Sequence, residues 1–256
     1  MLFGREYMPE GAGVDPDAPR KKGAARLLEI LSRDLDSIFL SGTLAMLACA
    51  PAAILAGIAL WLGSLPLCLL AAAAAGWLVG PALTSLYDTI LRALRDEPGF
   101  WWHTYKRVWK QSFKSSLVPG IVFTLLWTLV AYAAFVLPQL TEVSAGFGLV
   151  LVVDMVLLLT LGNYYWMQNA LFETSLSQKL SNCVRMFLGF LPRTALSAAF
   201  QLGYWLLMAA VIPRCAFIFL LTGLWVPNLL AALAVYAPVE KSLHLEEQIR
   251  AKQETN

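Results

Sequence analysis

Among the residues of this chain that could do chemistry, Asp154 stands out because it lies inside a long uncharged run. The run begins near residue 146, so the carboxyl group lies about two helical turns from its start. An ionisable group in hydrocarbon is costly unless it faces protein, water or a partner. Two interpretations remain open. Asp154 either has a structural role, paired with Arg214 or wetted by lipid headgroups, or binds an ion or substrate.

Other polar residues in the apolar runs have ordinary structural explanations. Gln201 and Thr84 can hydrogen-bond between helices, which contributes about 0.6 kcal/mol on average. The polar and aromatic segment 163–169 is typical of positions where helices leave the hydrocarbon, so we interpret it as an interfacial anchor rather than a binding site.

Motifs for catalysis or metal binding are missing from the sequence. The four cysteines form no CxxC pair, the two histidines lack metal-ligand spacing, and no GxSxG, HExxH or P-loop pattern occurs. We therefore expect no catalytic residue, no metal site and no cofactor, and we do not expect an enzyme.

The elements that must position these residues follow from the composition. The chain is 59% hydrophobic and 14% charged, whereas a soluble domain keeps roughly 25% charged residues. The apolar runs are long enough for crossings of about 20 residues each. We predict an all-α, polytopic helical membrane protein with one membrane domain, 24–239, between a disordered tail, 1–23, and a second tail, 240–256. The predicted spans are 38–62, 65–87, 115–137, 146–166, 194–212 and 215–236.

The connector 80–114 joins the second and third spans and changes abruptly from apolar to basic and aromatic. Its cations are Arg92, Arg95, Lys106, Arg107, Lys110 and Lys114, and its rings are Phe100, Trp101, Trp102, Tyr105, Trp109 and Phe113. From residue 101 on, helical spacing puts most of the rings on one face and the lysines on another. This pattern predicts an interfacial amphipathic helix on anionic headgroups of the lipid bilayer. A docking site for a partner protein is the alternative, and we expect no nucleic acid here.

Two further segments have amphipathic spacing. The segment that begins at Ala24 predicts a surface helix leading into the first span, and the connector 173–192 predicts a second basic interfacial helix. Arg214 is the one Lys or Arg on the side opposite these segments. The positive-inside rule therefore places both termini in the cytoplasm.

Motifs along the chain resemble those of the YesL family of bacterial membrane proteins. They lie in the N-terminal segment 13–23, in Gly80-Pro81-Ala82-Leu83-Thr84, and in Tyr87, Leu91-Arg92, Asp96-Glu97 and Trp109-Lys110-Gln111-Ser112-Phe113-Lys114. The chain differs from the family at Ser41-Gly42, where relatives often carry an asparagine. The resemblance implies a domain of unknown function in a bacterial plasma membrane. Members are often linked with carbohydrate-uptake operons, beside ABC-type sugar importers.

These observations favour a non-enzymatic accessory or regulatory membrane component linked to carbohydrate uptake. The partner would be an ABC-type sugar importer or another membrane protein. The alternative is a small secondary transporter or channel that uses Asp154. An inverted repeat would favour a transporter, but the basic connectors occupy different positions within the first and last three spans.

Overall fold

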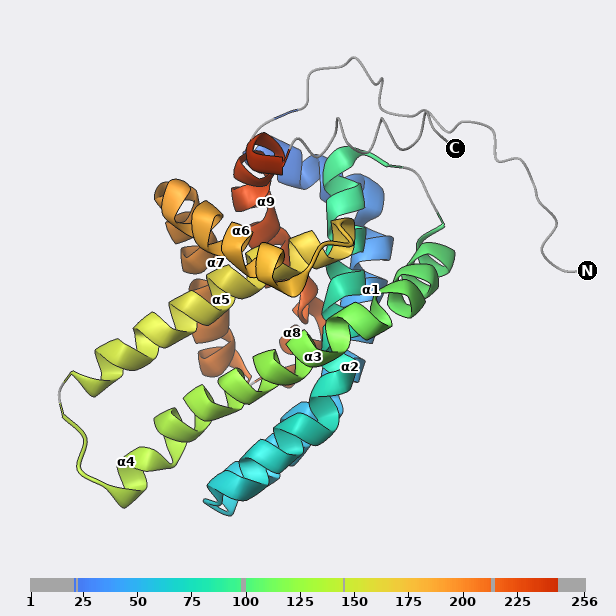
Figure 1. Ribbon diagram of the computed structural model, residues 1–256. Coiled ribbons are helices and arrows are strands. Elements are labelled where there is room, and N and C mark those ends of the chain that lie inside the picture. The colour runs from blue at the N-terminus through green and yellow to red at the C-terminus, as the bar shows by residue number, and fades with distance from the viewer. Residues whose placement is uncertain (1–20, 22, 98–99, 145, 213–214, 244–256) are drawn as a thin grey trace, which may run out of the picture.

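The helices account for most of the computed structural model, which describes residues 21, 23–97, 100–144, 146–212 and 215–243. No strand occurs in these residues, and the fold is all-α and polytopic, as the sequence predicts (Figure 1). The helices are α1 (Ala24–Trp61), α2 (Leu65–Arg95), α3 (Trp101–Phe135), α4 (Leu137–Leu140), α5 (Phe147–Leu171), α6 (Leu176–Gly189), α7 (Leu191–Val211), α8 (Ala216–Thr222) and α9 (Trp225–Leu243).

Five helices are long and apolar enough to cross a membrane: α1, α2, α5, α7 and α3 together with α4. The pair α8 and α9 would make a sixth span, bent by 46° at the break between them. Gly223 lies in this break with φ of 45°, a backbone conformation that glycine adopts without steric cost. The predicted span 215–236 therefore corresponds to a broken helix rather than a continuous one.

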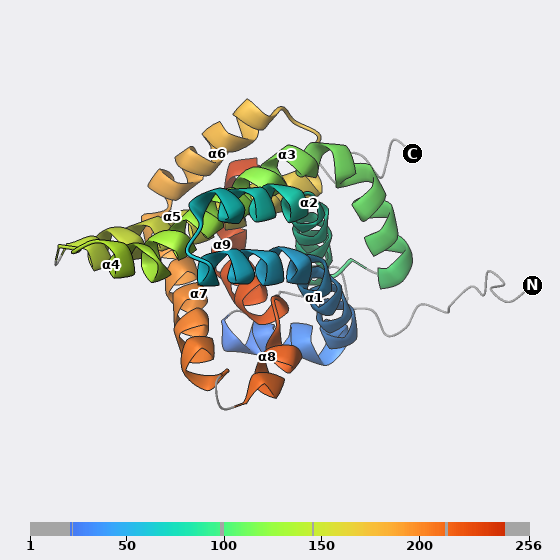
Figure 2. The same ribbon diagram turned by 90° about the horizontal axis from the view of Figure 1, so that it is seen from below.

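Helices α1 and α3 are longer than the spans predicted within them. The surface helix predicted from Ala24 and the amphipathic helix predicted from Trp101 are not separate elements but the first turns of α1 and α3. No glycine or proline separates either segment from the apolar run that follows, so the helical hydrogen bonding continues. In Figure 2 the first turns of α3 run in a different direction from the rest of that helix.

Helix α2 lies at the centre of the bundle, between α1 and α3, and also contacts α5 and α9. Its second half is almost wholly buried, from Val79 to Leu91. Helices α3 and α5 are joined through α4 and lie side by side (Figure 1). Helix α7 packs against α9, and α6 packs against the second half of α5. We call the basic end the end where α1, α3 and α7 begin and α2, α5 and α9 end.

Residues 163–169 lie inside the protein and not at a lipid interface. Every side chain from Asn163 to Asn169 is buried, and Tyr164 and Met167 are fully enclosed. The anchor interpretation was therefore wrong. These amides and rings lie against α2, α3, α6 and α7, where Tyr164, Gln168 and Asn169 form hydrogen bonds with protein side chains.

Candidate functional site

A buried lysine, Lys179, is the centre of a polar network near the basic end. Its side chain is only 3% exposed, and its Nζ donates a hydrogen bond of 2.7 Å to Asn169 Oδ1. Asn169 Nδ2 donates in turn to Thr84 Oγ1 and Ser116 Oγ, each at 2.9 Å. Among the described residues Lys179 forms no ion pair. The network thus joins α2, α3, α5 and α6 through a cation whose hydrogen-bond partner is neutral.

Helix α6 positions the lysine through its amphipathic sequence. The helix begins with a capping box, in which Ser175 and Gln178 exchange side-chain and backbone hydrogen bonds. Its buried face carries Lys179, Cys183 and Met186. Its exposed face carries an apolar stripe at four-residue spacing: Leu176, Leu180, Val184 and Leu188. The lysine faces the protein while the leucines do not, the reverse of the arrangement in a soluble surface helix.

Burial shifts the pKa of this lysine. The loss of hydration lowers the pKa of Lys179, and the charge of the nearby Glu173 carboxylate opposes that change to a smaller extent. A lysine with a lowered pKa loses its proton at a lower pH than a surface lysine does. The charge of this network therefore depends on pH.

Close packing of α2 against α3 brings Thr84 and Ser116 together. Their hydroxyl oxygens lie 3.0 Å apart. A Cβ on Gly80 would lie 2.1 Å from Ser116 O, and a Cβ on Gly120 would lie 2.6 Å from Gly80 N, so only glycine fits at either position. Gly76 and Gly80 form a GxxxG pattern, the small-residue spacing that allows membrane helices to approach closely.

Asp96 joins the start of α1 to the end of α2. It caps α2 in the left-handed conformation, with φ of 63°. Its carboxylate accepts a hydrogen bond of 2.7 Å from Arg26 Nη2 and a second one from Arg33 Nη1. Burial alone would raise the pKa of Asp96, but the hydrogen bonds and charges of the two arginines outweigh it, so the pKa lies below its ordinary value.

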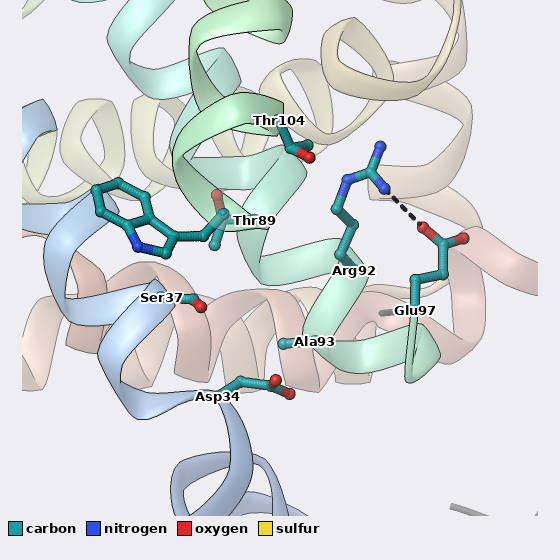
Figure 3. Close-up of a pocket in the computed structure, with 8 residues that line it drawn as sticks. Asp34, Ser37, Thr89, Arg92, Ala93, Glu97 and Thr104 are labelled. Carbon is teal, nitrogen blue, oxygen red and sulfur yellow. Dashed lines mark hydrogen bonds and ion pairs between the residues drawn. The ribbon is translucent and has the colours of Figure 1, made fainter. Parts of the chain in front are cut away.

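A second group of ion pairs borders a small pocket at the basic end. Arg92 Nε donates to Asp88 Oδ2 at 2.8 Å and Nη1 donates to Glu97 Oε2 at 3.4 Å. Figure 3 shows the Arg92 and Glu97 side chains pointing toward each other on one side of this pocket. The cavity volume is about 80 Å³. Its lining comes from α1, α2, the α2–α3 connection and α3: Asp34, Ser37, Thr89, Arg92, Ala93, Glu97, Trp101 and Thr104.

The first turns of α3 present charges outward and aromatic rings mostly inward. Tyr105 and Val108 are buried, while Trp101, Trp109 and Phe113 are partly covered. Trp102 is the exception, at 54% exposure. The aromatic face predicted to rest on lipid therefore packs largely against the protein. The exposed face carries Trp102, His103, Lys106, Arg107, Lys110 and Lys114, which we call the basic face. No ion pair occurs within the basic face or between it and other described residues.

Asp154 lies apart from these groups, on the outer half of α5. It lines a groove of about 410 Å³ between α3 and α5, whose other lining residues are Leu126, Leu129, Val130, Ala133, Leu157 and Leu158. Asp154 has no hydrogen bond or ion pair with any described residue. Its predicted partner Arg214 lies outside the described residues, so that pairing stays a prediction.

Gln201 belongs to a different contact, between α7 and α9. Its Nε2 donates to Asn228 Oδ1 at 3.3 Å, and Tyr87 OH donates to the same oxygen at 3.0 Å. Gln201 Oε1 is buried and accepts no hydrogen bond from the described residues. The structure therefore separates Gln201 from Asp154 and places Thr84 in the Lys179 network. Pro81 continues α2 beside Gly80.

Sequence reasoning missed the central residues of this network, Lys179 and Asn169. Asn169 was assigned to an interface because it follows an apolar run, and Lys179 looked like an ordinary cation of a basic connector. The GxxxG pattern at Gly76 and Gly80 was the available signal, because it marks the helix contact at which the network forms.

Comparison with known proteins matches part of the chain to a family model. Residues 54–133 match the model described as "Protein of unknown function, DUF624". The match runs from the second half of α1 through α2 into α3, and it includes Gly80, Thr84, Asp96 and Ser116. No curated protein and no solved structure matches the chain. Over these residues the chain is similar to a family of unknown function.

Proposed function

We propose that this protein is a non-enzymatic accessory or regulatory component of a bacterial plasma-membrane assembly that serves carbohydrate uptake. Both termini lie in the cytoplasm in this proposal, so the basic end faces the cytoplasm as well. The protein acts by binding a partner, an ABC-type sugar importer or another membrane protein, through the basic face of α3.

The observation that carries this proposal is the concentration of exposed cations on the basic face. Lys106, Lys110 and Lys114 recur at four-residue spacing, and Arg107 lies beside them. None of these cations has a carboxylate partner within the described part of the chain. A group of like charges is unfavourable in isolation and attracts a surface of opposite charge. The exposed ring of Trp102 adds the kind of aromatic anchor that is enriched at interfaces.

The link to carbohydrate uptake depends on the resemblance to the YesL family. The matched region 54–133 contains the Gly80-Pro81-Ala82-Leu83-Thr84 motif, the acidic pair Asp96-Glu97 and the lysines of the basic face. This overlap supports the proposal that the chain is related to the YesL family. The proposed substrate class, carbohydrates, comes from the operons with which members of that family are often linked.

Photocrosslinking tests the proposal in intact cells. A photoreactive amino acid at Lys110 or Trp102 of the full chain should yield one defined protein adduct. The same amino acid at Arg185, an exposed position on α6, should not yield it. Lys106→Glu together with Lys114→Glu should reduce the adduct at least tenfold. Adducts with lipid alone would show that the basic face binds anionic headgroups and would contradict the proposal.

A secondary transporter or channel is the second candidate, and the position of the half-buried Asp154 in its groove supports it. Asp154→Asn should then abolish solute uptake or proton-linked flux in reconstituted vesicles. Flux that persists in this variant would eliminate the candidate. We favour the accessory function because the groove is lined by two helices only and lacks a second ionisable group.

A further inference from the structure

The groove around Asp154 combines an apolar lining with a single acid. Two helices supply the lining, α3 with Leu126, Leu129, Val130 and Ala133, and α5 with Leu157 and Leu158. The volume of about 410 Å³ falls in the range of pockets that hold ligand-sized groups. Asp154 is seven residues from the start of α5, which places it about 10 Å from that helix end. The acid is thus within the apolar part of the fold.

A carboxylate without a partner is unfavourable at this depth. The occupant of the groove should therefore be one that compensates the charge of Asp154. Lipid tails would cover the leucines but offer neither a hydrogen bond nor an opposite charge. A second copy packed symmetrically through the same groove would bring two Asp154 carboxylates toward each other, which like-charge repulsion disfavours. A membrane-spanning helix that carries one cation satisfies both the apolar lining and the acid.

We infer that the groove between α3 and α5 binds a membrane-spanning helix of a partner subunit that carries a single Lys or Arg at the depth of Asp154. The apolar side chains of that helix pack on Leu126, Leu129 and Leu158, and its cation pairs with the carboxylate. This inference rests on the proposed function, because it names the chemistry of a partner within the membrane. It assigns the groove to assembly rather than to solute passage.

Defined peptides test this chemistry without knowledge of the natural partner. The probes are two polyleucine membrane-spanning peptides, one with a single lysine about 10 Å from the end that matches the start of α5, and one with leucine there. The full-length protein carries a photoreactive amino acid at Leu129 and is reconstituted with either peptide in phosphatidylcholine vesicles. We expect crosslinking of the lysine peptide at least tenfold above that of the leucine peptide.

Charge variants separate ion pairing from general apolar contact. Asp154→Asn should abolish the preference for the lysine peptide, whereas Asp154→Glu should retain it. Asp154→Lys should transfer the preference to a peptide with aspartate at the same position. Equal crosslinking of the lysine and leucine peptides by the wild-type protein would overturn the inference.

A further variant addresses Arg214, the basic residue that the sequence predicts on the same side as Asp154. If Arg214→Gln leaves the wild-type preference unchanged, the groove is open to a partner. If the lysine peptide binds only after that substitution, Arg214 itself occupies the site and the inference is wrong. A negative result with these peptides would leave crosslinking at Lys110 unaffected, so the failure of the groove and the failure of the basic face are distinguishable.

Discussion

At the scale of single residues, the most informative feature is a buried cation with a neutral partner. Lys179 donates to Asn169, and Asn169 in turn holds the hydroxyl groups of Thr84 and Ser116. A buried ammonium group needs its hydrogen bonds more than an uncharged group does, because the low dielectric of the interior raises the free-energy cost of a charge without partners. Asn169 therefore contributes to stability mainly by accepting the hydrogen bond of the Lys179 ammonium group.

Loss of the amide should cost more than loss of the charge. We expect Asn169→Leu to reduce the free energy of unfolding by about 2–3 kcal/mol, because the ammonium group is left without its acceptor. Lys179→Met should cost less, since it removes the buried charge and leaves only an amide oxygen unmet. The double variant Asn169→Leu/Lys179→Met should recover part of the loss. Thermal unfolding in detergent measures all three, and additive effects would contradict coupling.

The same pair predicts a pH dependence with a defined sign. Because the pKa of Lys179 is lowered in the folded protein, the folded state binds fewer protons than the unfolded state between that lowered pKa and 10.5. Stability should therefore rise with pH across this window. The rise should be larger in Asn169→Leu, whose charged lysine lacks an acceptor, and Lys179→Met should lack this contribution. Melting temperatures at pH 7 and pH 9.5 provide the comparison.

At the scale of helices, the lengths of the apolar runs predicted where the helices lie in the sequence. They did not predict which side chains of each helix contact other helices. The break near Gly63 and the long runs on either side of it were sufficient to place α1 and α2. The burial of residues 163–169 could not be predicted, because an amide at the end of a span suits a lipid interface and a helix contact equally well. For a similar reason the sequence did not predict which face of α6 packs against the protein, because that face carries Lys179.

The crossing of α2 and α3 should be the contact most sensitive to a single methyl group. Gly80→Ala places a Cβ against the backbone oxygen of Ser116, so the helices must separate and the Thr84–Ser116 contact must lengthen. We expect a loss of about 1–3 kcal/mol, the usual cost of overpacking, seen as a lower melting temperature. Gly57→Ala on α1 is the matched control, because a Cβ there meets nothing within 4 Å. Equal effects of the two variants would contradict the close crossing.

At the scale of the whole molecule, the number of crossings depends on how the pair α8 and α9 lies in the membrane. With 7 and 19 residues, the two helices have a combined length of about 39 Å, enough for a hydrocarbon core of about 30 Å despite the bend. Helix α9 ends at the same end of the bundle at which α1 begins (Figure 1), as six crossings require. A re-entrant pair would instead return to the side on which it began.

Reporter fusions distinguish the two topologies. With six crossings and a cytoplasmic N-terminus, green fluorescent protein fused after the last residue should fluoresce, and alkaline phosphatase at the same place should be inactive. Alkaline phosphatase inserted at Thr141, between α4 and α5, should be active, because the positive-inside rule places this turn, which lacks Lys and Arg, outside. Active phosphatase at the C-terminus would mean that α8 and α9 form a re-entrant pair and that five helices cross. The charged residues at the start of α1 and at the end of α9 would then face opposite compartments, which the clustering of the described Lys and Arg residues at the basic end disfavours.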